Sequence, residues 1–511
     1  MSQRHVVIVG GGLAGLSAGC YARASGLRTT IIEHNLALGG VCTAWSRGPY
    51  TIDGCIHWLT GGPFQKLYEE LGIVPRVALR PLEQFLTYRD AMDGKEVTIS
   101  RDLAATARAL REIAPEDADE IRRLVDGAEH VARLEPPFER PAELATMRDQ
   151  LATLWGMRHE LGTLAHFRAP VGVWAVEHLR SPRLRRLFTR MLPEKATALT
   201  LLMILGYLER GYLSRPEGGT ARFRDALVDT YRRLGGEVRI HSTVDEVLVE
   251  GARARGVRLA DGAFLDADVV VSTSSAPETV LRLLGGRYGG SETRHRLERW
   301  EMFQHIVLAS YGVALPLAGV PSTLLVDHVE PLTVGGITSD HLYVRVYNEE
   351  ASFAPTGHTV VQAMVETDYA HWATRGPRYN SDKDAVGALV LERLDRCLPG
   401  VGAAARLTDV ATPITFWSSA RSWRGAYEGW LPTAEAMLGH IKKTLPGLDA
   451  FYMAGQWVEP GGGVPTALAS GRQVVQLVCA DLGLPFVSRP GELAQAAIPP
   501  SSRPPPPEVR R

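Results

Sequence analysis

The stretch Val6-Val7-Ile8-Val9-Gly10-Gly11-Gly12-Leu13-Ala14-Gly15 determines the fold of the first part of the chain. Four β-branched apolar residues give the pattern of a buried strand, and the glycines that follow read G-x-G-x-x-G before a helical pattern begins. Glu33 ends a second β pattern, residues 29–32. Strand, glycine turn, helix and acidic residue in this order predict a βαβ unit that binds a dinucleotide.

Each residue of this unit has a physical task. Gly10 permits the tight turn out of the strand, Gly12 lets the backbone approach a pyrophosphate, and Gly15 lets helix and strand pack closely. The helix N-terminus offers free N–H groups to the phosphates. Glu33 is placed to accept hydrogen bonds from a ribose hydroxyl. NAD and FAD share this pattern, so the unit alone leaves the dinucleotide open.

Further glycine-rich segments favour FAD. Gly39-Gly40 follows the acidic residue closely, and Tyr50-Thr51-Ile52-Asp53-Gly54 reads aromatic-x-x-Asp-Gly. Far away, residues 451–455 form a strand pattern ending in glycine, and the loop 460–465 precedes a helical pattern over residues 466–478. These segments resemble FAD proteins of the amine oxidase and phytoene desaturase superfamily. The resemblance implies that both ends of the chain hold FAD.

The resemblance extends from about Val6 to Leu482 and is closest to phytoene desaturases, carotenoid isomerases and retinol saturases. It implies an α/β fold, in which a Rossmann-type FAD-binding domain is interleaved with a substrate domain. It also implies that the Val244 backbone lies near the adenine. The expected cofactor-binding residues are Gly10, Gly12, Leu13, Ala14, Gly15, Glu33, Gly39, Gly40, Val244, Gly455, Gly462, Gly463 and Val464.

The predicted domains alternate along the chain. The FAD-binding domain takes residues 1–75, 215–290 and 405–487. The substrate-binding domain takes residues 76–214, a mainly helical segment that we call the helical roof, and residues 291–404, a mixed segment with strand patterns. The proline-rich tail, residues 488–511, lacks apolar periodicity and is predicted to be disordered.

Four aromatic residues are the candidate wall of the reaction site. They are His57 and Trp58, in a loop that reaches the flavin in related proteins, and Trp417 and Tyr427, in an aromatic and glycine-rich segment. His57 could donate a proton or a hydrogen bond to the reacting carbons, or be a packed histidine bound to backbone. In such relatives the flavin carries the redox chemistry, so no nucleophilic triad is required.

Composition excludes several classes of protein. A 45% apolar content predicts a large core, and a net charge of −1 argues against nucleic acid as a partner. The five cysteines have no C-x-x-C spacing, so we predict neither a metal site nor a redox pair. The sequence shows no secretory signal, and its longest apolar segment, residues 196–208, is too short to span a bilayer. These features predict a cytoplasmic protein.

One segment of the helical roof leaves two interpretations open. Ser181-Pro182 is a good helix start, and apolar residues then share one face of residues 181–192. Arg183, Arg185, Arg186 and Arg190 lie on or beside the other face. Such a helix can dock on an anionic membrane surface, or can be an ordinary surface helix with its apolar face inward.

The resemblance predicts an FAD-dependent oxidoreductase that desaturates or saturates carbon–carbon bonds of an apolar isoprenoid or polyene. A reduced-flavin-dependent isomerase of the carotenoid type is the first alternative. A flavin amine oxidase is the second, although none of the six lysines lies in a convincing central strand, where such relatives place one near the flavin. A non-catalytic escort protein of the same fold, similar to GDP-dissociation inhibitors, is the remote alternative.

Overall fold

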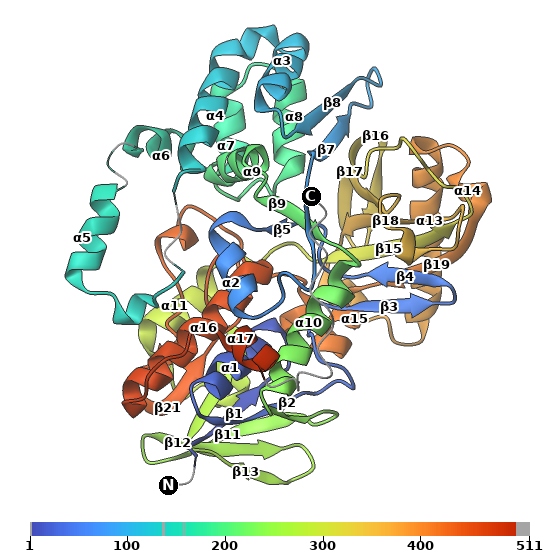
Figure 1. The fold of residues 1–511 in the computed structure, drawn as a ribbon. Helices are drawn as coiled ribbons and strands as arrows, with labels where there is room; N and C mark the ends of the chain where they lie inside the picture. The colour runs from blue at the N-terminus through green and yellow to red at the C-terminus, as the bar shows by residue number, and fades with distance from the viewer. Residues whose placement is uncertain (1–2, 135–137, 157, 159, 497–511) are drawn as a thin grey trace.

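The structure, a computed structural model, describes residues 3–134, 138–156, 158 and 160–496 (Figure 1). Its first sheet joins strands from three distant parts of the chain, residues 5–32, 237–272 and 444–453. In order across the sheet, the strands are β10 (Glu237–Arg239), β2 (Arg28–Ile32), β1 (His5–Val9), β14 (Val269–Ser272), β21 (Leu448–Met453), β12 (Arg253–Leu259) and β11 (Val244–Glu250). β13 (Phe264–Asp266) pairs with β12, and β20 (Thr444–Leu445) with β21.

The centre of the first sheet is parallel. β1 pairs in parallel with β2 on one side and with β14 on the other, and β14 pairs in parallel with β21. Val7 and Ile8 are fully buried, as expected for a strand covered on both faces. The carboxyl ends of these strands therefore meet at one edge, where the glycine turn after β1 lies.

The first and last long helices pack directly on each other. α1 (Leu13–Ala24) contacts α16 (Gly463–Leu482), and the Ser17 hydroxyl donates to the Leu468 carbonyl at 2.7 Å. The approach requires glycine, because a Cβ at Gly471 would lie 2.5 Å from the Ala14 carbonyl oxygen. The N-terminal nucleotide-binding unit is thus completed by the other end of the chain.

The second sheet has seven strands and is antiparallel except at one pairing. In order, they are β19 (Ala405–Ala411), β15 (Ile306–Val313), β18 (Thr359–Glu366), β17 (Ile337–Val346), β16 (Thr323–Val334), β7 (Gln84–Arg89) and β8 (Glu96–Ser100). β7 pairs in parallel with β16. Figure 1 shows this sheet beside the first, with α13 (Tyr379–Cys397) against it.

The helical roof covers the other side of the molecule. Its helices are α3 (Leu103–Ile113), α4 (Ala118–Val131), α5 (Met147–Gly156), α6 (Leu161–Phe167), α7 (Val171–His178), α8 (Pro182–Met191) and α9 (Leu199–Glu209). Most gather at the top of Figure 1, whereas α5 projects to one side. Asp102 caps the start of α3, since its carboxylate accepts from the Ala105 N–H at 2.8 Å.

Two predictions about segment boundaries are wrong. Residues 405–411 were expected in the FAD-binding domain, but β19 pairs with β15 of the second sheet. The tail was expected to be disordered, yet Pro490–Ala496 forms helix α17 against α1, α2 (Gln65–Glu70) and α10 (Gly219–Arg233). Small residues allow that packing, because the Gly491 backbone lies against Gly72 and Ala494 is buried. Residues 497–511 lie outside the described residues.

Three of the four arginines of α8 contact carboxylates of this same chain, and the fourth, Arg185, donates to the Leu179 carbonyl. Arg183 binds Asp90 at 2.7 Å, Arg186 binds the same carboxylate at 2.7 Å, and Arg190 binds Asp340 at 2.5 Å. The apolar face of α8 is buried in the helical roof. This arrangement favours the second interpretation of residues 181–192, a helix fixed to the roof.

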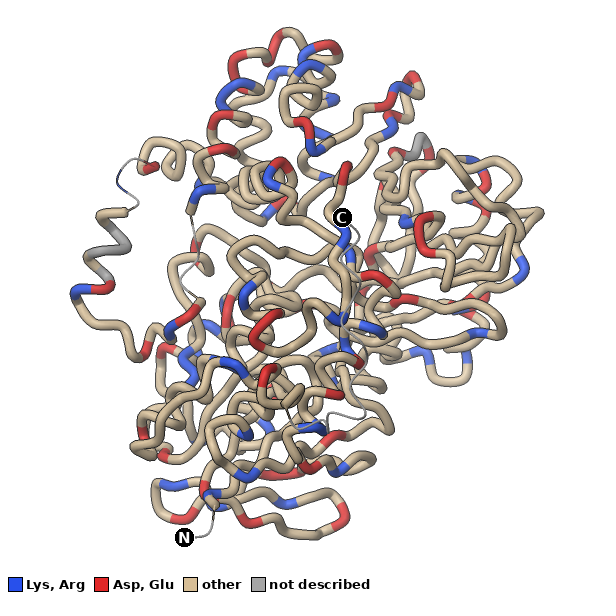
Figure 2. Tube along the Cα trace, in the orientation of Figure 1, with Lys and Arg blue, Asp and Glu red and all other residues tan. Residues whose placement is uncertain are grey.

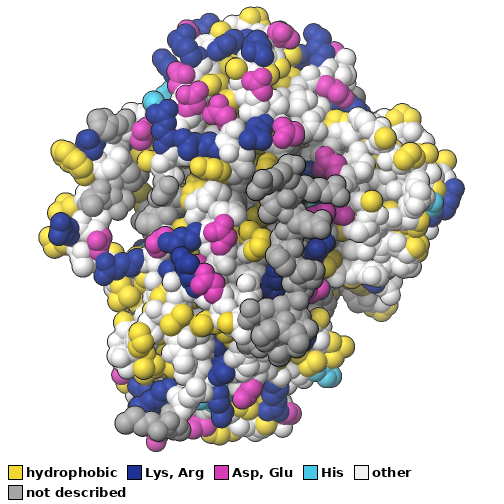
Figure 3. Space-filling model, viewed as in Figure 1, with side chains coloured by type: hydrophobic (Ala, Val, Ile, Leu, Met, Phe, Trp, Pro, Cys, Tyr) yellow, Lys and Arg dark blue, Asp and Glu magenta, His cyan; other side chains and the backbone are white. Residues whose placement is uncertain are grey.

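Positively and negatively charged side chains are mixed along the chain (Figure 2) and on the face seen in Figure 3. Figure 2 shows lysines and arginines beside aspartates and glutamates along the trace, and the face in Figure 3 carries both signs interspersed. None of the helices in the described part of the chain has the length and apolar character needed to cross a membrane.

A buried ion pair joins α16 to the helix that ends at Glu70. Arg472 Nε donates to Glu70 Oε2 at 2.8 Å, and the Tyr21 hydroxyl donates to the same oxygen at 2.7 Å. We expect Arg472→Leu to lower the free energy of unfolding by about 3–5 kcal/mol, because Glu70 would keep an uncompensated buried charge. Urea unfolding followed by circular dichroism measures the change.

The exposed pair Arg489–Glu492, 2.8 Å apart, supplies the control for this prediction. Arg489→Leu should change the stability by less than about 1 kcal/mol, because water already solvates both charges. Equal unfolding midpoints for the two variants would contradict the role given to the buried pair.

Candidate active site

A cavity of about 1110 Å³ runs from the first sheet to the second sheet and the helical roof. Its wall includes the turn after β1, the loop before α16, the segment 54–58, strands β15, β17 and β18, and helices α8 and α9. Such a position, at the carboxyl ends of parallel strands, is where open α/β sheets bind ligands.

The glycines of the first unit leave room for a ligand at one end of this cavity. Gly10 has φ +101°, so it makes a turn that other residues rarely adopt. Gly12 forms a backbone bridge with Gly39, and a Cβ at Gly12 would meet no protein atom closer than 3.9 Å. Because Gly12 lines the cavity, that open space belongs to the cavity itself.

Glu33 is buried and lines the same end of the cavity. The Gly11 N–H donates to its Oε2 at 2.7 Å, and the Asn35 N–H donates to its Oε1 at 2.7 Å. Burial raises the pKa of Glu33. The two backbone donors hold the carboxyl group in one orientation, and each oxygen keeps a lone pair for a ribose hydroxyl.

The loop before α16 supplies a second glycine-rich wall. Gly461, Gly462 and Gly463 have φ of +88°, +57° and +83°, a run of positive values that favours glycine. α16 begins at Gly463, so its N-terminus opens on the cavity. A helix N-terminus stabilises negative charge placed before it.

Ser275 is a cavity residue that the motifs did not point to. Its hydroxyl is buried and has no hydrogen-bond partner among the described residues. A polar run, residues 272–275, at the carboxyl end of a buried strand could have signalled it. An unpartnered hydroxyl, an open glycine wall and an oriented carboxylate together fit the phosphates and ribose of FAD.

The structure brings most of the predicted cofactor-binding residues into the cavity wall. They are Gly10, Gly12, Leu13, Ala14, Glu33, Gly39, Gly40, Gly455, Gly462, Gly463 and Val464. Gly15 lies inside α1, where a Cβ would be 2.0 Å from the Gly10 carbonyl oxygen, so its place is one of close packing. Val244 does not line the cavity. Its carbonyl instead accepts from Arg282 Nη2 at 3.1 Å.

Three of the four predicted wall residues line the cavity, and Trp417 does not. Its side chain lies on the outer side of α15 (Pro413–Ala420), 40% exposed, with the Arg421 guanidinium 4.3 Å above the ring. The buried residues of α15 are Pro413 and Phe416. Because α15 packs on the protein through Pro413 and Phe416, Trp417 is left on its outer side.

His57 is a neutral imidazole in this environment. Burial, together with the nearby guanidinium groups of Arg345 and Arg215, lowers its pKa to about 3. Its ring stacks parallel to Tyr343 with centroids 6.0 Å apart, and Arg215 Nε donates to its carbonyl oxygen at 2.9 Å. His57 can therefore offer an N–H or accept a hydrogen bond, but it does not supply a proton as an imidazolium.

Glu428 is the acidic group that the sequence analysis missed. It lies beside Tyr427 in the cavity wall, and no hydrogen bond to its carboxyl group is seen among the described residues. Burial raises its pKa to about 7. A carboxyl group with this pKa both gives and takes protons near neutral pH, as general acid–base chemistry requires. The one available sign in the sequence was an acidic residue, Glu428, between Tyr427 and Gly429 in an aromatic and glycine-rich segment.

Cys42 and Cys55 also line the cavity, although their spacing in the sequence gave no sign that they lie close together. In the hairpin of β3 (Ala44–Arg47) and β4 (Tyr50–Asp53), Ala44 pairs with Asp53, which places Cys42 opposite Cys55. The contact with Cys42 and burial both raise the pKa of Cys55 well above its usual range. Cys55 is therefore a protonated thiol at neutral pH and a weak nucleophile.

Comparison with known proteins agrees with this geometry. The family described as flavin containing amine oxidoreductase matches residues 13–479. The chain is 27% identical over 506 residues to the phytoene desaturase (neurosporene-forming) of Rhodobacter capsulatus, covering 93% of this chain and 94% of that one. It is 26% identical over 300 residues to the chloroplastic prolycopene isomerase of Arabidopsis thaliana, covering 56% and 49%.

Among solved structures, an oxidoreductase from Methanosarcina mazei shares the fold. Its TM-score is 0.61 at 15% identity, covering 92% of this chain and 100% of that one. The chain belongs to the flavin-containing amine oxidoreductase family. It is an FAD-dependent oxidoreductase of α/β fold, as the resemblance predicted. Gly10, Gly12 and the loop glycines Gly461–Gly463 form a glycine cradle in the cavity wall, and this cradle would hold the cofactor.

Proposed function

We propose that the protein desaturates carbon–carbon single bonds of an apolar isoprenoid or polyene. The observation that carries this proposal is the continuity of the glycine-lined end of the cavity with a largely apolar slot. The apolar residues of the slot include Phe85, Val131, Leu164, Leu199, Met203, Ile204, Leu308 and Met364. The similarity to a phytoene desaturase over nearly the full length of both chains supports the same reaction.

The residues of the chain divide the work of this reaction. The glycine-lined end of the cavity would hold FAD, which would supply the redox chemistry as a hydride acceptor. The slot holds a long apolar substrate and excludes water, so that substrate carbons are positioned by packing rather than by polar contacts. Glu428, with its pKa near 7, takes up a proton in the wall of the site. Neutral His57 and Trp58 shape the wall at segment 54–58.

A flavin-dependent isomerase is the second candidate, because the partial similarity to a prolycopene isomerase favours it. Saturation of a polyene would use the same slot in the reverse direction. An amine oxidase is disfavoured, since no lysine occurs among the described residues of the cavity wall. Membrane contact through residues 181–192 is disfavoured, because three arginines of this segment bind aspartates of the same chain.

Anaerobic mixing tests the proposal. Oxidised enzyme and a partly saturated isoprenoid such as phytoene should give bleaching of the flavin absorption and a product with one more double bond by chromatography. Lycopene, whose central chain is already conjugated, is the control and should cause much less bleaching. Conversion seen only after prior reduction of the flavin would reject desaturation in favour of isomerisation or saturation.

A further inference from the structure

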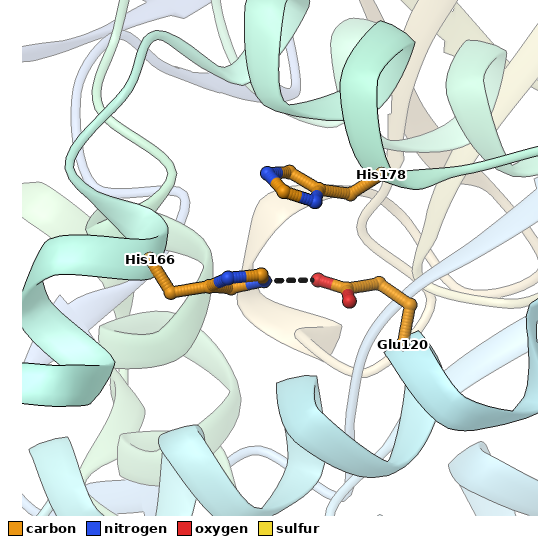
Figure 4. Close-up of side chains that lie close together, drawn as sticks. All are labelled: Glu120, His166 and His178. Atoms are coloured by element: carbon orange, nitrogen blue, oxygen red, sulfur yellow. Dashed lines mark hydrogen bonds and ion pairs between the residues drawn. The ribbon is translucent and has the colours of Figure 1, made fainter.

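Three side chains from separate helices meet in the helical roof, outside the cavity. Glu120 comes from α4, His166 from α6 and His178 from the end of α7 (Figure 4). One donor atom from each lies within 4.8 Å of the other two. His166 Nε2 is 2.7 Å from Glu120 Oε1, and the two imidazole centroids are 4.4 Å apart. Figure 4 shows the His166 ring directed at the carboxylate and the His178 ring above that contact in this view.

The carboxylate of Glu120 is held in position by a second set of residues. Its side chain is 7% exposed, and Trp174 Nε1 donates to Oε1 at 3.1 Å. Arg123 Nη1 lies 3.3 Å from the other oxygen, Oε2, and its own side chain is 61% exposed. The arginine charge is therefore largely solvated, and it contacts the carboxylate oxygen that His166 does not contact. Outer partners of this kind orient metal ligands.

His178 has no partner that explains its position. Neither of its ring nitrogens makes a hydrogen bond within the described residues, and its recorded contact is the tilted approach to His166. Two adjacent imidazoles gain little from each other alone, whereas a cation between their nitrogens and a carboxylate would bind all three. Two histidines and one glutamate form a common three-ligand set for Zn²⁺, with the remaining position left to water.

We propose that Glu120, His166 and His178 bind a divalent transition-metal ion of the Zn²⁺ type. The ion would join α6 and α7 to α4. Because Leu164 of α6 lines the cavity, the ion would hold one part of the substrate wall in place without touching the flavin end. Cysteine spacing gave no signal for this site, because its ligands are a glutamate and two histidines that three helices bring together.

Titration of the protein with Zn²⁺ tests this site. Untagged, full-length, FAD-loaded protein is treated with EDTA, desalted and titrated by calorimetry, and its zinc content is measured by mass spectrometry after gel filtration. We expect one Zn²⁺ per chain and a higher melting temperature with zinc than with EDTA. His166→Ala and His178→Ala should each weaken zinc binding by more than about tenfold.

The matched control is His130→Ala, in the same helical roof. His130 Nδ1 lies 3.4 Å from Glu160 Oε2, but the described residues offer this pair no third ligand. The control should bind zinc as the wild type does. Melting temperatures in EDTA show whether the variants fold, and His178→Gln replaces His178→Ala if the latter does not. Zinc-free wild type after gel filtration, or equal binding by wild type and both ligand variants, would overturn the proposal.

Discussion

Replacement of Gly12 by valine is expected to give a folded protein that has lost at least about nine-tenths of its FAD. Gly12 has φ −71° and ψ −178°, so its backbone accepts a side chain without strain. The nearest protein atom to its Cβ would be 3.9 Å away, which leaves the valine methyl groups pointing into open cavity. They would occupy the space where the pyrophosphate approaches the backbone.

The ratio of flavin absorption to protein absorption, after purification and after incubation with excess FAD, measures this loss. Gly162→Val in α6 is the control, because a Cβ there meets nothing within 4 Å and lies away from the glycine cradle. The control should retain its FAD. A Gly12→Val protein with full FAD would show that the cofactor lies elsewhere.

Replacement of Glu428 by glutamine is expected to slow flavin reduction by substrate about 100-fold or more, the usual range for loss of a general acid or base. The variant keeps the shape of the side chain and loses only its titration. In the wild type, the rate should change with an apparent pKa near 7, and this step in the pH–rate profile should vanish in the variant. Stopped-flow measurement of anaerobic flavin bleaching gives both quantities.

The same substitution has a stability consequence with a definite sign. Burial raises the pKa of Glu428 from 4.5 to about 7, so the folded protein holds this proton more tightly than the unfolded chain does. The resulting stabilisation is complete below about pH 4.5 and is lost as the pH rises through about 7, for a total of roughly 3 kcal/mol. Glu428→Gln should therefore lose less stability than wild type between pH 6 and about 8.5.

Urea unfolding at the two pH values measures that difference. Glu435→Gln is the control, because Glu435 lies in the same region of the sequence but is exposed. It should leave both the pH–rate profile and the pH dependence of unfolding unchanged. If Glu428→Gln behaved like this control, the carboxyl group would have no part in proton transfer.

The elements of the cofactor end were predictable because their signals are local. The turn at Gly10 and the loop at Gly462 need glycine because of backbone geometry within a few residues, so the sequence shows them directly. Glu428 and Ser275 escaped prediction because their chemistry comes from burial, which depends on distant segments. Trp417 was misplaced for the same reason, since composition does not say which side of α15 packs inward.

The substrate end was predictable only in outline. Residues 76–214 were predicted to be mainly helical and residues 291–404 mixed, but β7 and β8 of the second sheet come from the first of these segments. β19 also crosses the predicted boundary, because its pairing with β15 is a long-range contact. Likewise, the sequence shows a basic face on α8 but not its partners. In the structure, Arg186 binds Asp90 and Arg190 binds Asp340. Pairwise contacts between distant residues are the information that one sequence does not carry.

The contact of α1 with α16 sets the order of events when this protein is made. β1 and α1 leave the ribosome before the loop 460–465 and α16, which are translated more than 430 residues later. At roughly 5–20 residues per second, the nascent chain waits on the order of tens of seconds with an unfinished cofactor site. The cavity wall that includes both glycine segments can therefore form only after α16 has been made and has packed on α1.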